Sequence, residues 1–412
     1  MKFLHLSDLH IGKSVNGFSM LEEQAHVFKQ VKGYVHSHKP EAVVIAGDIY
    51  DRSAPGADAV RVFDVFLTEL AETGAAVMFI SGNHDSPERL SYASRLLCHR
   101  GVHARGVFDG SRPVTLADQY GPVNFWLMPF VKPSMVQAEG AAFESYTDAF
   151  AAVLATADID FDQRNVIVAH QFFTRAGVLS IRSDSEIDPV GGLDAIDASV
   201  LSRFDYAALG HLHGAQRVGG DNIRYAGSPL KYSFSECRQE KSITLVELCE
   251  KGRLAVTALP LTPIRDMREI KGTLAELMSA ASANEEPGEQ ANGDLSVGRE
   301  DGPPYAGRVF AASLRRKFRE DYLRVILTDE AEIIDPMGKI RSVYPNVMVL
   351  AFENSRTRVD LGAVSTDMET SGAGALSPYE LFNEFFLEIS GAVMNAEQEK
   401  IVKALLEKAD EL

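Results

Sequence analysis

The chain alternates short apolar runs with longer segments in which apolar residues recur at every third or fourth position. The short runs are nearly continuous in Val, Ile, Leu, Phe and Ala, which is typical of buried strands. The longer segments have the helical period and predict helices packed on those strands. The strands are predicted at 2–7, 42–47, 76–81, 123–128, 165–170, 206–211 and 242–248, and the helices at Leu21–Ser37, Asp58–Glu72, Pro87–His99 and Tyr146–Ala157. This alternation indicates an α/β domain over residues 1–263.

The pattern changes twice in the rest of the chain. Residues 279–305 are rich in Gly, Pro, Ser, Asn and Glu. They predict a flexible insertion, because this composition cannot bury enough surface to offset its chain entropy. Strand-like runs at 321–330 and 347–354 predict a smaller second domain over 264–353, and the polar stretch after it predicts a linker over 354–377.

The C-terminal segment, residues 378–412, predicts two amphipathic helices. The first begins at Ser377 and Pro378, a favourable pair for the start of a helix. Its apolar side chains at helical spacing are Leu381, Phe382, Phe385, Phe386 and Ile389, and those of the second helix are Ile401, Leu405 and Leu412. Two interpretations are open, because these apolar faces could pack on their own domain or dock on a partner protein.

Composition and charge narrow the class of protein. A chain of 412 residues exceeds one typical domain, and its 45% apolar content predicts a folded, soluble protein. The net charge of −17 argues against broad nonspecific binding to nucleic acid, although it does not exclude a local site. No apolar run approaches the length of about 18 residues that a membrane span needs. Cys98, Cys237 and Cys249 form neither a disulfide framework nor a zinc motif, so we predict a cytoplasmic protein.

Polar clusters follow five of the predicted strands, and they read SDLHIG, GDIYDR, GNHD, VAHQ and GHLHG. Each cluster alone is compatible with an ordinary turn or a buried histidine. Their joint occurrence favours a functional site, because sites in open α/β sheets collect at the carboxyl ends of strands. The candidate residues are Asp8, His10, Asp48, Asp51, Asn83, His84, His170, His211 and His213.

The residue types and their spacing point to metal binding. In extended chain, residues two apart point the same way, so Asp8 and His10 present two ligands to one side. The candidate donors are two carboxylates, one amide oxygen and four imidazoles, with His84 left over, which is more than a single zinc ion takes. Mixed nitrogen and oxygen ligands without thiolate favour Mn²⁺, Fe²⁺ or Zn²⁺. Two such ions about 3.5–4 Å apart are a common device for displacement at a phosphoester.

The five motifs, in this order, resemble those of the calcineurin-like metallophosphoesterases. Within that superfamily the chain is similar to the SbcD family, the nuclease subunits of bacterial SbcC–SbcD complexes. The opening MKFLHLSDLHIGK, the stretch YAGSPLKYSFSE and the stretch SPYELFNEFF carry this closer resemblance, which covers all of the chain except 279–305. The resemblance implies an αββα sandwich of mixed sheets, a smaller α+β capping domain over 264–353, and partner-binding helices over 378–412.

The resemblance also implies roles for the candidate residues. It implies two sets of three ligands and one bridging carboxylate: Asp8, His10 and His213 for one ion, Asn83, His170 and His211 for the other, and Asp48 for both. His84 would stay unligated and assist departure of the leaving oxygen, and Asp51 would orient His84. Asp85 is expected to be a hydrogen-bond acceptor behind the ligands or the first residue of a helix.

The function implied by the resemblance is that of an Mn²⁺-dependent DNA nuclease in repair and recombination. Such a nuclease would be a homodimer and would join an SbcC-like coiled-coil ATPase. It would act as an exonuclease on double-strand ends and as an endonuclease on single strands and hairpins. ATP would belong to the partner, because no G-x-x-x-x-G-K-[ST] loop occurs in this sequence.

Two other functions are open on the sequence alone. One is a metallophosphatase or small-molecule phosphodiesterase with the same metals, which would not need the C-terminal third of the chain. The other is a noncatalytic scaffold for DNA ends, which would be expected to lose metal ligands. Every ligand position is filled, which favours an enzyme. The basic residues Arg315, Arg316, Lys317 and Arg319 either contact phosphate or form a solvated surface.

Overall fold

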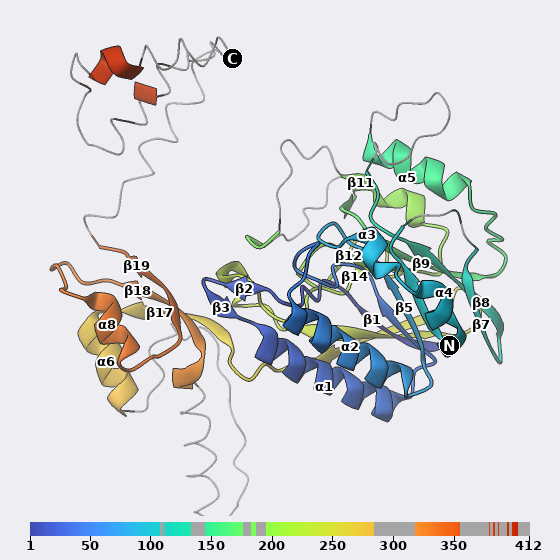
Figure 1. Cartoon of the computed structure of the whole chain (residues 1–412), viewed down its shortest axis with the longest axis horizontal. Helices are drawn as coiled ribbons and strands as arrows, with labels where there is room; N and C mark the ends of the chain where they lie inside the picture. Colours follow the sequence, from blue (N-terminus) through green and yellow to red (C-terminus); the bar gives the residue numbers. More distant parts are fainter. Residues whose placement is uncertain are drawn as a thin grey trace, which may run out of the picture. The chain divides into compact units, whose positions relative to one another are not determined.

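The computed structural model describes residues 1–107, 110, 112–132, 145–175, 183–186, 195–283 and 318–354, together with residues 379, 382, 383, 386, 394 and 398–402. The chain divides into two compact units, Met1–Asn354 and Ser355–Leu412. The described residues of the first unit form three sheets of three or more strands, which are drawn in Figure 1. The predicted linker and C-terminal helices lie almost entirely outside the described residues, so the structure does not test them.

The first large sheet combines four parallel strands with two antiparallel ones. Its order is β16-β15-β1-β4-β5-β6. The strands are β1 (Lys2–Leu6), β4 (Ala42–Ile45), β5 (Ala76–Ile80), β6 (Val102–Arg105), β15 (Ser242–Leu248) and β16 (Leu254–Pro260). The run from β1 to β6 is parallel, whereas β15 and β16 pair antiparallel. The sheet is therefore mixed, as the predicted fold requires.

The second large sheet has the same kind of mixed pairing. Its order is β13-β14-β12-β9-β8-β7. The strands are β7 (Val114–Asp118), β8 (Gly121–Met128), β9 (Arg164–His170), β12 (Tyr206–Gly210), β13 (Gln216–Arg217) and β14 (Ile223–Tyr225). One buried cluster contains residues of both sheets, including Phe3, Ile80, Phe125 and Tyr206, so the two sheets pack face to face.

Helices cover the outer faces of both sheets. On the first sheet lie α1 (Leu21–His38) and α2 (Ala57–Ala71), whose buried residues join the cluster that contains Leu4 and Val43. On the second sheet lies α5 (Tyr146–Ala155), which packs through Phe150 against Phe173. Figure 1 shows this layered arrangement. The predicted αββα sandwich is therefore confirmed.

One predicted helix is wrong in its length. The structure replaces Pro87–His99 with two short helices, α3 (Pro87–Leu90) and α4 (Ser94–Leu97), followed by one 3-10 turn. The break lies at Ala93, which has a left-handed backbone with φ of 59°. Leu90 is buried whereas Leu96 is 73% exposed, so the apolar spacing does not mark one continuous buried face. The sequence pattern also failed to indicate β6, β7 and β16, which lie at or next to sheet edges.

A third, smaller sheet follows the sandwich. It contains the parallel strands β17 (Met267–Gly272), β18 (Tyr322–Leu327) and β19 (Val347–Phe352), in that order. Helices α6 (Leu274–Ala283) and α8 (Pro336–Arg341) share a buried cluster with the sheet through Leu277 and Ile340. Because α6 continues to Ala283, the insertion predicted from Ser279 begins too early. Residues 284–305 of that prediction lie outside the described residues.

Cys98, Cys237 and Cys249 are free thiols. Among the described residues, none of the helices combines the length and the apolar character that crossing a bilayer requires.

Candidate metal centre

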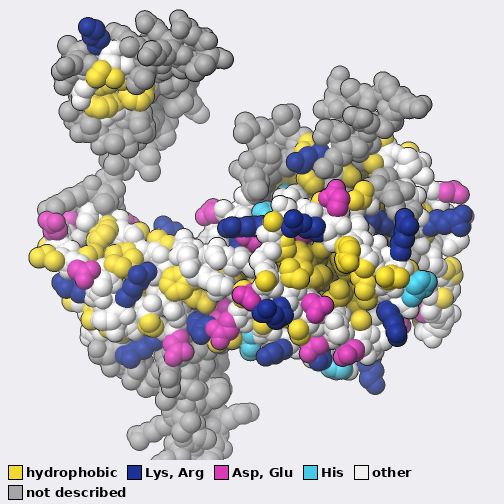
Figure 2. Space-filling model, in the orientation of Figure 1, with side chains coloured by type: hydrophobic (Ala, Val, Ile, Leu, Met, Phe, Trp, Pro, Cys, Tyr) yellow, Lys and Arg dark blue, Asp and Glu magenta, His cyan; other side chains and the backbone are white. Residues whose placement is uncertain are grey.

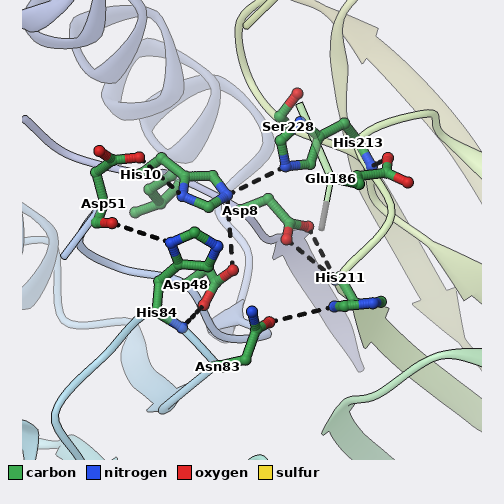
Figure 3. Close-up of polar contacts among 12 residues, drawn as sticks. Asp8, His10, Asp48, Asp51, Asn83, His84, Glu186, His211, His213 and Ser228 are labelled. Atoms are coloured by element: carbon green, nitrogen blue, oxygen red, sulfur yellow. Dashed lines mark hydrogen bonds and ion pairs between the residues drawn. The ribbon is translucent and has the colours of Figure 1, made fainter. Parts of the chain in front are cut away.

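The predicted site residues lie where strands of both large sheets end. β1, β4 and β5 are parallel neighbours in one sheet, and β9 and β12 are parallel neighbours in the other. Turns after the first three strands carry Asp8, His10, Asp48, Asp51, Asn83 and His84, while β9 ends in His170 and β12 leads into His211 and His213. Figure 3 shows the labelled side chains converging between the two sheets. The sandwich therefore brings together motifs that are more than 200 residues apart.

Three of the predicted ligands form what we call the first half of the site, namely Asp8, His10 and His213. One ligand atom from each lies within 4.8 Å of the others. The Nε2 atoms of His10 and His213 are 3.1 Å apart. All three residues are at most 2% exposed. These side chains present one oxygen and two nitrogens to the same small volume.

The other predicted set, Asn83, His170 and His211, forms the second half. The Asn83 Oδ1 atom lies 3.0 Å from His170 Nε2 and 3.2 Å from His211 Nδ1. His170 is fully buried, whereas Asn83 and His211 are half-buried. The amide oxygen and the two ring nitrogens form a second cluster of possible metal ligands. This cluster is more open to solvent than the first half.

Asp48 lies between the two halves. Its Oδ2 atom is 3.6 Å from His10 Nε2 in the first half and 3.4 Å from His170 Nε2 in the second. Its other carboxylate oxygen, Oδ1, accepts a hydrogen bond of 2.9 Å from the main-chain N–H of His84. One carboxylate oxygen is thus available to both halves, while the other holds the turn that carries His84.

The backbone is strained at several of these positions. Among the described residues, eight that are not glycine have positive φ, and four of them are Asp8, His10, Asp48 and His211. A left-handed conformation costs such residues roughly 1–2 kcal/mol, and such strain collects at functional sites. Gly82 packs so closely on Asp48 that a Cβ atom at this position would overlap the carboxylate. The turns are therefore shaped for the side chains that they present.

Burial and neighbouring charge set the protonation of the cluster. Burial lowers the pKa of His10 to about 4, so its ring is neutral at pH 7 and can act as a ligand. Burial also disfavours the charged form of His170, but the Asp48 and Asp8 carboxylates outweigh it and raise the pKa of His170 to about 9. Burial raises the pKa of Asp8. Burial would likewise raise the pKa of Asp48, but the neighbouring His170 holds that pKa well below its usual range.

The residues present fit divalent cations. Asp8 and Asp48 are carboxylates that are at most 2% exposed, and burying such charges is costly unless cations compensate them. The ring nitrogens of His10 and His213 face each other at 3.1 Å, as ligands of a common ion do. The nearby Nδ1 atom of His170 lies 2.8 Å from the Ala46 carbonyl oxygen, which fixes its Nε2 atom toward the site. Carboxylate, amide and imidazole groups suit Mn²⁺, Fe²⁺ or Zn²⁺.

His84 lies beside the first half, at the rim of the site. Its ring packs edge-on against that of His10, with the ring centres 4.8 Å apart. Its Nδ1 atom lies 2.9 Å from the main-chain carbonyl oxygen of Asp51. A carbonyl oxygen can only accept a hydrogen bond, so His84 Nδ1 carries a proton. The other ring nitrogen, Nε2, points away from Asp51. One of its ring nitrogens is also within 4.8 Å of ligand atoms of His10 and Asp48.

The contact of Asp51 with His84 differs from our expectation. The main-chain carbonyl of Asp51 holds His84, whereas its carboxylate points elsewhere. The carboxylate accepts a hydrogen bond of 2.8 Å from Lys13 Nζ and lies 3.6 Å from His10 Nδ1, as Figure 3 shows for His10. These neighbours hold the pKa of Asp51 below its usual range, against the effect of burial. The Asp51 side chain therefore faces a ligand of the first half.

Asp85 is a hydrogen-bond acceptor behind the ligands. Its carboxylate accepts from the main-chain N–H groups of Ile49, Tyr50 and Gly82, at 3.0, 2.9 and 2.9 Å. These donors belong to the two turns that carry Asp48 and Asn83. The first of our two expectations for Asp85 is thus confirmed, and the residue ties two ligand-bearing turns together.

Sequence reasoning missed the side chains that support the first half. Gln24, on α1, donates from Nε2 to the His10 carbonyl at 2.7 Å and accepts from the Gly12 N–H at 3.0 Å. Its neighbour Tyr232 donates to the Leu9 carbonyl at 2.5 Å. Tyr232 belongs to the YAGSPLKYSFSE stretch that carried the family resemblance, but its spacing gave no indication of this contact.

Comparison with known families decides the class of this protein. Residues 1–215 match the family model of the calcineurin-like phosphoesterases, which is more than half of the chain. The chain belongs to this family. It is therefore a metal-dependent hydrolase of phosphoesters, and the matched region contains all of the predicted ligands. Residues 263–389 match a second model, described as the type 5 capsule protein repressor C-terminal domain and named SbcD_C.

Two curated relatives resemble the chain beyond the phosphoesterase region. The SbcD component of the SbcCD nuclease of Staphylococcus saprophyticus is 29% identical over 419 residues, which cover 99% of each chain. The corresponding SbcD component from Staphylococcus epidermidis is also 29% identical, over 357 residues and 85% of each chain. The predicted resemblance to the SbcD family is confirmed by these relatives.

Two solved structures align more loosely. Phosphopantetheinyl hydrolase from Mycobacterium tuberculosis aligns with a TM-score of 0.35 and 18% identity, over 55% of this chain and 88% of that one. A dimetal phosphatase from Danio rerio aligns with a TM-score of 0.35 and 13% identity, over 64% of this chain and 99% of that one.

Proposed function

We propose that the chain is an SbcD-type nuclease that hydrolyses DNA phosphodiester bonds and acts with an SbcC-like ATPase in repair and recombination. The observation that carries the proposal is the extent of the similarity to the SbcD component from Staphylococcus saprophyticus, which spans 99% of both chains. A phosphoesterase for small molecules would not require the region after the sandwich, and that region matches a model of its own. Exonuclease action on double-strand ends and endonuclease action on hairpins and single strands belong to the proposal.

Two divalent cations are part of the proposed mechanism, and Mn²⁺ is our choice among those that suit the ligands. The first half and the second half would each hold one ion, and Asp48 would contact both. When bound, such cations activate water and compensate charge on the phosphate oxygens. The protein contributes rigid turns at strand ends, the strained backbone of Asp8 and Asp48, and the fixed orientation of His170 through Ala46.

His84 would act on the leaving group rather than bind metal. Its Nδ1 atom is engaged by the Asp51 carbonyl, which directs Nε2 toward a substrate at the rim. Its main-chain N–H is held by Asp48, so the ring position depends on the same carboxylate that would join the two metals. His84 would therefore be a catalytic residue that, with both ring nitrogens protonated, donates a hydrogen bond or a proton from Nε2 to the departing sugar oxygen.

The proposed assembly includes a homodimer. Val65 on α2, Tyr92 after α3 and Leu96 on α4 are 52%, 83% and 73% exposed. Figure 2 shows hydrophobic side chains gathered over these three helices. Exposed apolar patches of this kind often mark contact surfaces. Light scattering should find a dimer for the full chain and a monomer for the double variant Tyr92→Glu, Leu96→Glu. If this variant formed dimers as stable as those of the wild type, this surface would not be the dimer interface.

The predicted helices over 378–412 would dock on the coiled coil of the ATPase, in a helix-in-groove mode. They lie mostly outside the described residues, so their support comes from the sequence and from the match over 263–389. A cytoplasmic setting also belongs to the proposal, and the free state of the three cysteines supports it.

The decisive experiment compares substrates. The full chain, with and without the ATPase, is incubated with labelled hairpin DNA, a phosphomonoester and a cyclic nucleotide in the presence of Mn²⁺. The proposal expects cleavage of the hairpin and little turnover of the small substrates. Turnover of the small substrates alone would favour the metallophosphatase or small-molecule phosphodiesterase. Absence of hydrolysis with both metal positions filled would favour a noncatalytic scaffold.

A further inference from the structure

We propose that Ser185 and Glu236 form a relay that orients the predicted metal ligand His213, with Lys241 as the fixed counter-charge of Glu236. Ser185 and Glu236 would be positioning residues, because neither belongs to the predicted ligands. The inference rests on the proposed function only in taking His213 as a ligand. Its structural basis is a set of buried and partly buried contacts that join three distant segments of the chain.

The contacts of Ser185 determine which nitrogen of His213 is free. The Ser185 hydroxyl donates to Glu236 Oε1 at 2.7 Å and lies 2.7 Å from His213 Nδ1. A serine hydroxyl has one proton, and a carboxylate can only accept it. Because Ser185 donates its proton to Glu236, it accepts a hydrogen bond from His213, so Nδ1 carries hydrogen. In the neutral ring, His213 Nε2 then carries no hydrogen, and it is this atom that faces His10 in the first half.

Glu236 is held in place by a buried cation. Glu236 is fully buried, and its Oε2 atom accepts a hydrogen bond of 2.6 Å from Lys241 Nζ. Lys241, 7% exposed, also donates to the main-chain carbonyl of His213 at 2.9 Å and to Ser228 Oγ at 3.0 Å. A buried carboxylate needs such a partner. The same lysine thus fixes both the relay and the backbone of the histidine that the relay orients.

A third contact holds the other side of the His213 backbone. Glu186, next to Ser185, accepts a hydrogen bond of 2.7 Å from the main-chain N–H of His213. Figure 3 shows Glu186 beside His213. The N–H, the carbonyl and the Nδ1 atom of His213 are therefore all engaged by residues that are not predicted ligands. This arrangement leaves Nε2 as the ring atom that is directed into the site.

The size of the expected effect follows from other metal sites. Partners behind a ligating histidine typically change metal affinity by about 10–100-fold when they are removed. Ser185→Ala removes the acceptor for His213 Nδ1 and is a small change. Glu236→Gln keeps the size of the side chain but leaves Lys241 without its counter-charge, so this variant carries a greater risk to the fold.

The test measures metal binding and the tautomer of His213 in the full chain. Free Mn²⁺ is followed by electron paramagnetic resonance during titration of the wild type, Ser185→Ala, Ser185→Thr and Glu236→Gln, with the exposed Glu240→Gln as the matched control. We expect one of two ions to bind about 10–100-fold more weakly in Ser185→Ala and Glu236→Gln. Ser185→Thr keeps the hydroxyl and should restore affinity, and Glu240→Gln should behave as the wild type.

Nitrogen NMR of the metal-free chain with labelled histidine gives a second readout. The His213 signal, assigned by its loss in His213→Gln, should show a proton on Nδ1 in the wild type and a mixed tautomer in Ser185→Ala. Unchanged tautomer and unchanged Mn²⁺ affinity in Ser185→Ala would overturn the relay. An equal loss of affinity for both ions would also overturn the relay, because it would indicate a general structural effect.

Failure of the relay can be separated from failure of the proposed function. A wild type that binds two Mn²⁺ ions but cleaves no DNA would contradict the nuclease proposal and leave the relay supported by its affinity data. If the wild type bound no Mn²⁺, the nuclease proposal would fail, and the tautomer measurement alone would decide the relay. A chain that cleaves hairpin DNA equally well in all variants, with unchanged Mn²⁺ affinity, would contradict the relay and not the function.

Discussion

The two halves of the candidate metal centre are built in different ways. Asp8, His10 and His213 in the first half are nearly inaccessible to solvent, and side chains such as Gln24 and Ser185 hold them from behind. In the second half, Asn83 and His211 are half-buried, and the Nδ1 atom of His170 contacts a main-chain carbonyl. One half depends on side-chain contacts that point mutations can remove, whereas the other depends more on the course of the backbone.

This difference suggests a division of labour between the halves. If the first half binds a metal ion as we propose, its burial suits it to hold that ion permanently, because the predicted ligands are fixed before the metal arrives. The half-buried second half, together with the rim position of His84, lies where a phosphate could enter from solvent. Variants that act on both halves, on neither, or on the first half alone test whether the two halves differ in this way.

The largest effect is expected from Asp48→Ala, since this carboxylate lies between the halves. Its Oδ2 atom is within 3.6 Å of His10 and 3.4 Å of His170. Removal of this carboxylate should weaken the binding of both ions. It should also lower the rate of hydrolysis by about 10³-fold or more, the size expected when charge stabilisation of the transition state is lost. Metal content by mass spectrometry and the hydrolysis rate test this, with the exposed Asp64→Ala as control. Loss of one ion alone would show that Asp48 does not join the halves.

His84→Ala should separate turnover from metal binding. We place His84 outside both halves, so this variant should keep two ions while kcat falls by about 10²-fold, a typical loss for a general acid. The measurements are Mn²⁺ stoichiometry and kcat at saturating metal. His99→Ala, a change at an exposed histidine, is the control. A lower Mn²⁺ stoichiometry in His84→Ala would place the residue among the ligands instead.

The sequence indicated the candidate ligands but not the side chains that support them, and the reason is physical. Asp8, Asp48 and Asn83 follow apolar strands directly, so a local pattern marks both the strand and the turn. Ser185 is 28 residues from the predicted ligand His213, and Glu236 is 51 residues from Ser185. A relay of this kind depends on how distant segments pack together, and no local spacing encodes it.

The fold shows the same limit. The buried strands of the sandwich were predicted because long apolar runs mark them, whereas the edge strands β7 and β16 alternate between partly buried and exposed positions. The helix predicted over Pro87–His99 failed at Ala93, whose positive φ no residue type in that stretch indicates. Asp51 is a related case. The sequence indicated that this residue contacts His84, but it could not indicate that the main-chain carbonyl, and not the carboxylate, makes the contact.

A smaller effect is expected from Gln24→Leu, which tests whether the first half depends on its supports. This fully buried amide bonds the main chain at Leu9, His10 and Gly12. Leaving these groups without partners should cost about 1–3 kcal/mol of unfolding free energy. The variant should also bind one Mn²⁺ ion more weakly and leave the affinity for the other unchanged. Urea unfolding of the metal-free chain and Mn²⁺ titration give the two quantities.

The matched control for Gln24→Leu lies on the same helix. Gln30 also bonds main chain, at Thr262, but far from the ligand turns. Gln30→Leu should therefore lower stability without changing Mn²⁺ affinity. If both variants altered Mn²⁺ binding equally, general loosening of α1 would explain the result, and the first half would have no special dependence on Gln24.

The smallest effect is expected from Asp51→Asn, which tests the carbonyl and the carboxylate of one residue separately. Asparagine keeps the main-chain carbonyl that holds His84, so kcat at saturating Mn²⁺ should change less than about twofold. The carboxylate lies 3.6 Å from His10 Nδ1, beyond a normal hydrogen bond, so the affinity of the first half should fall by less than about tenfold. The exposed Asp58→Asn is the control. A large loss of kcat with unchanged Mn²⁺ affinity would mean that the carboxylate, and not the carbonyl, orients His84 during turnover.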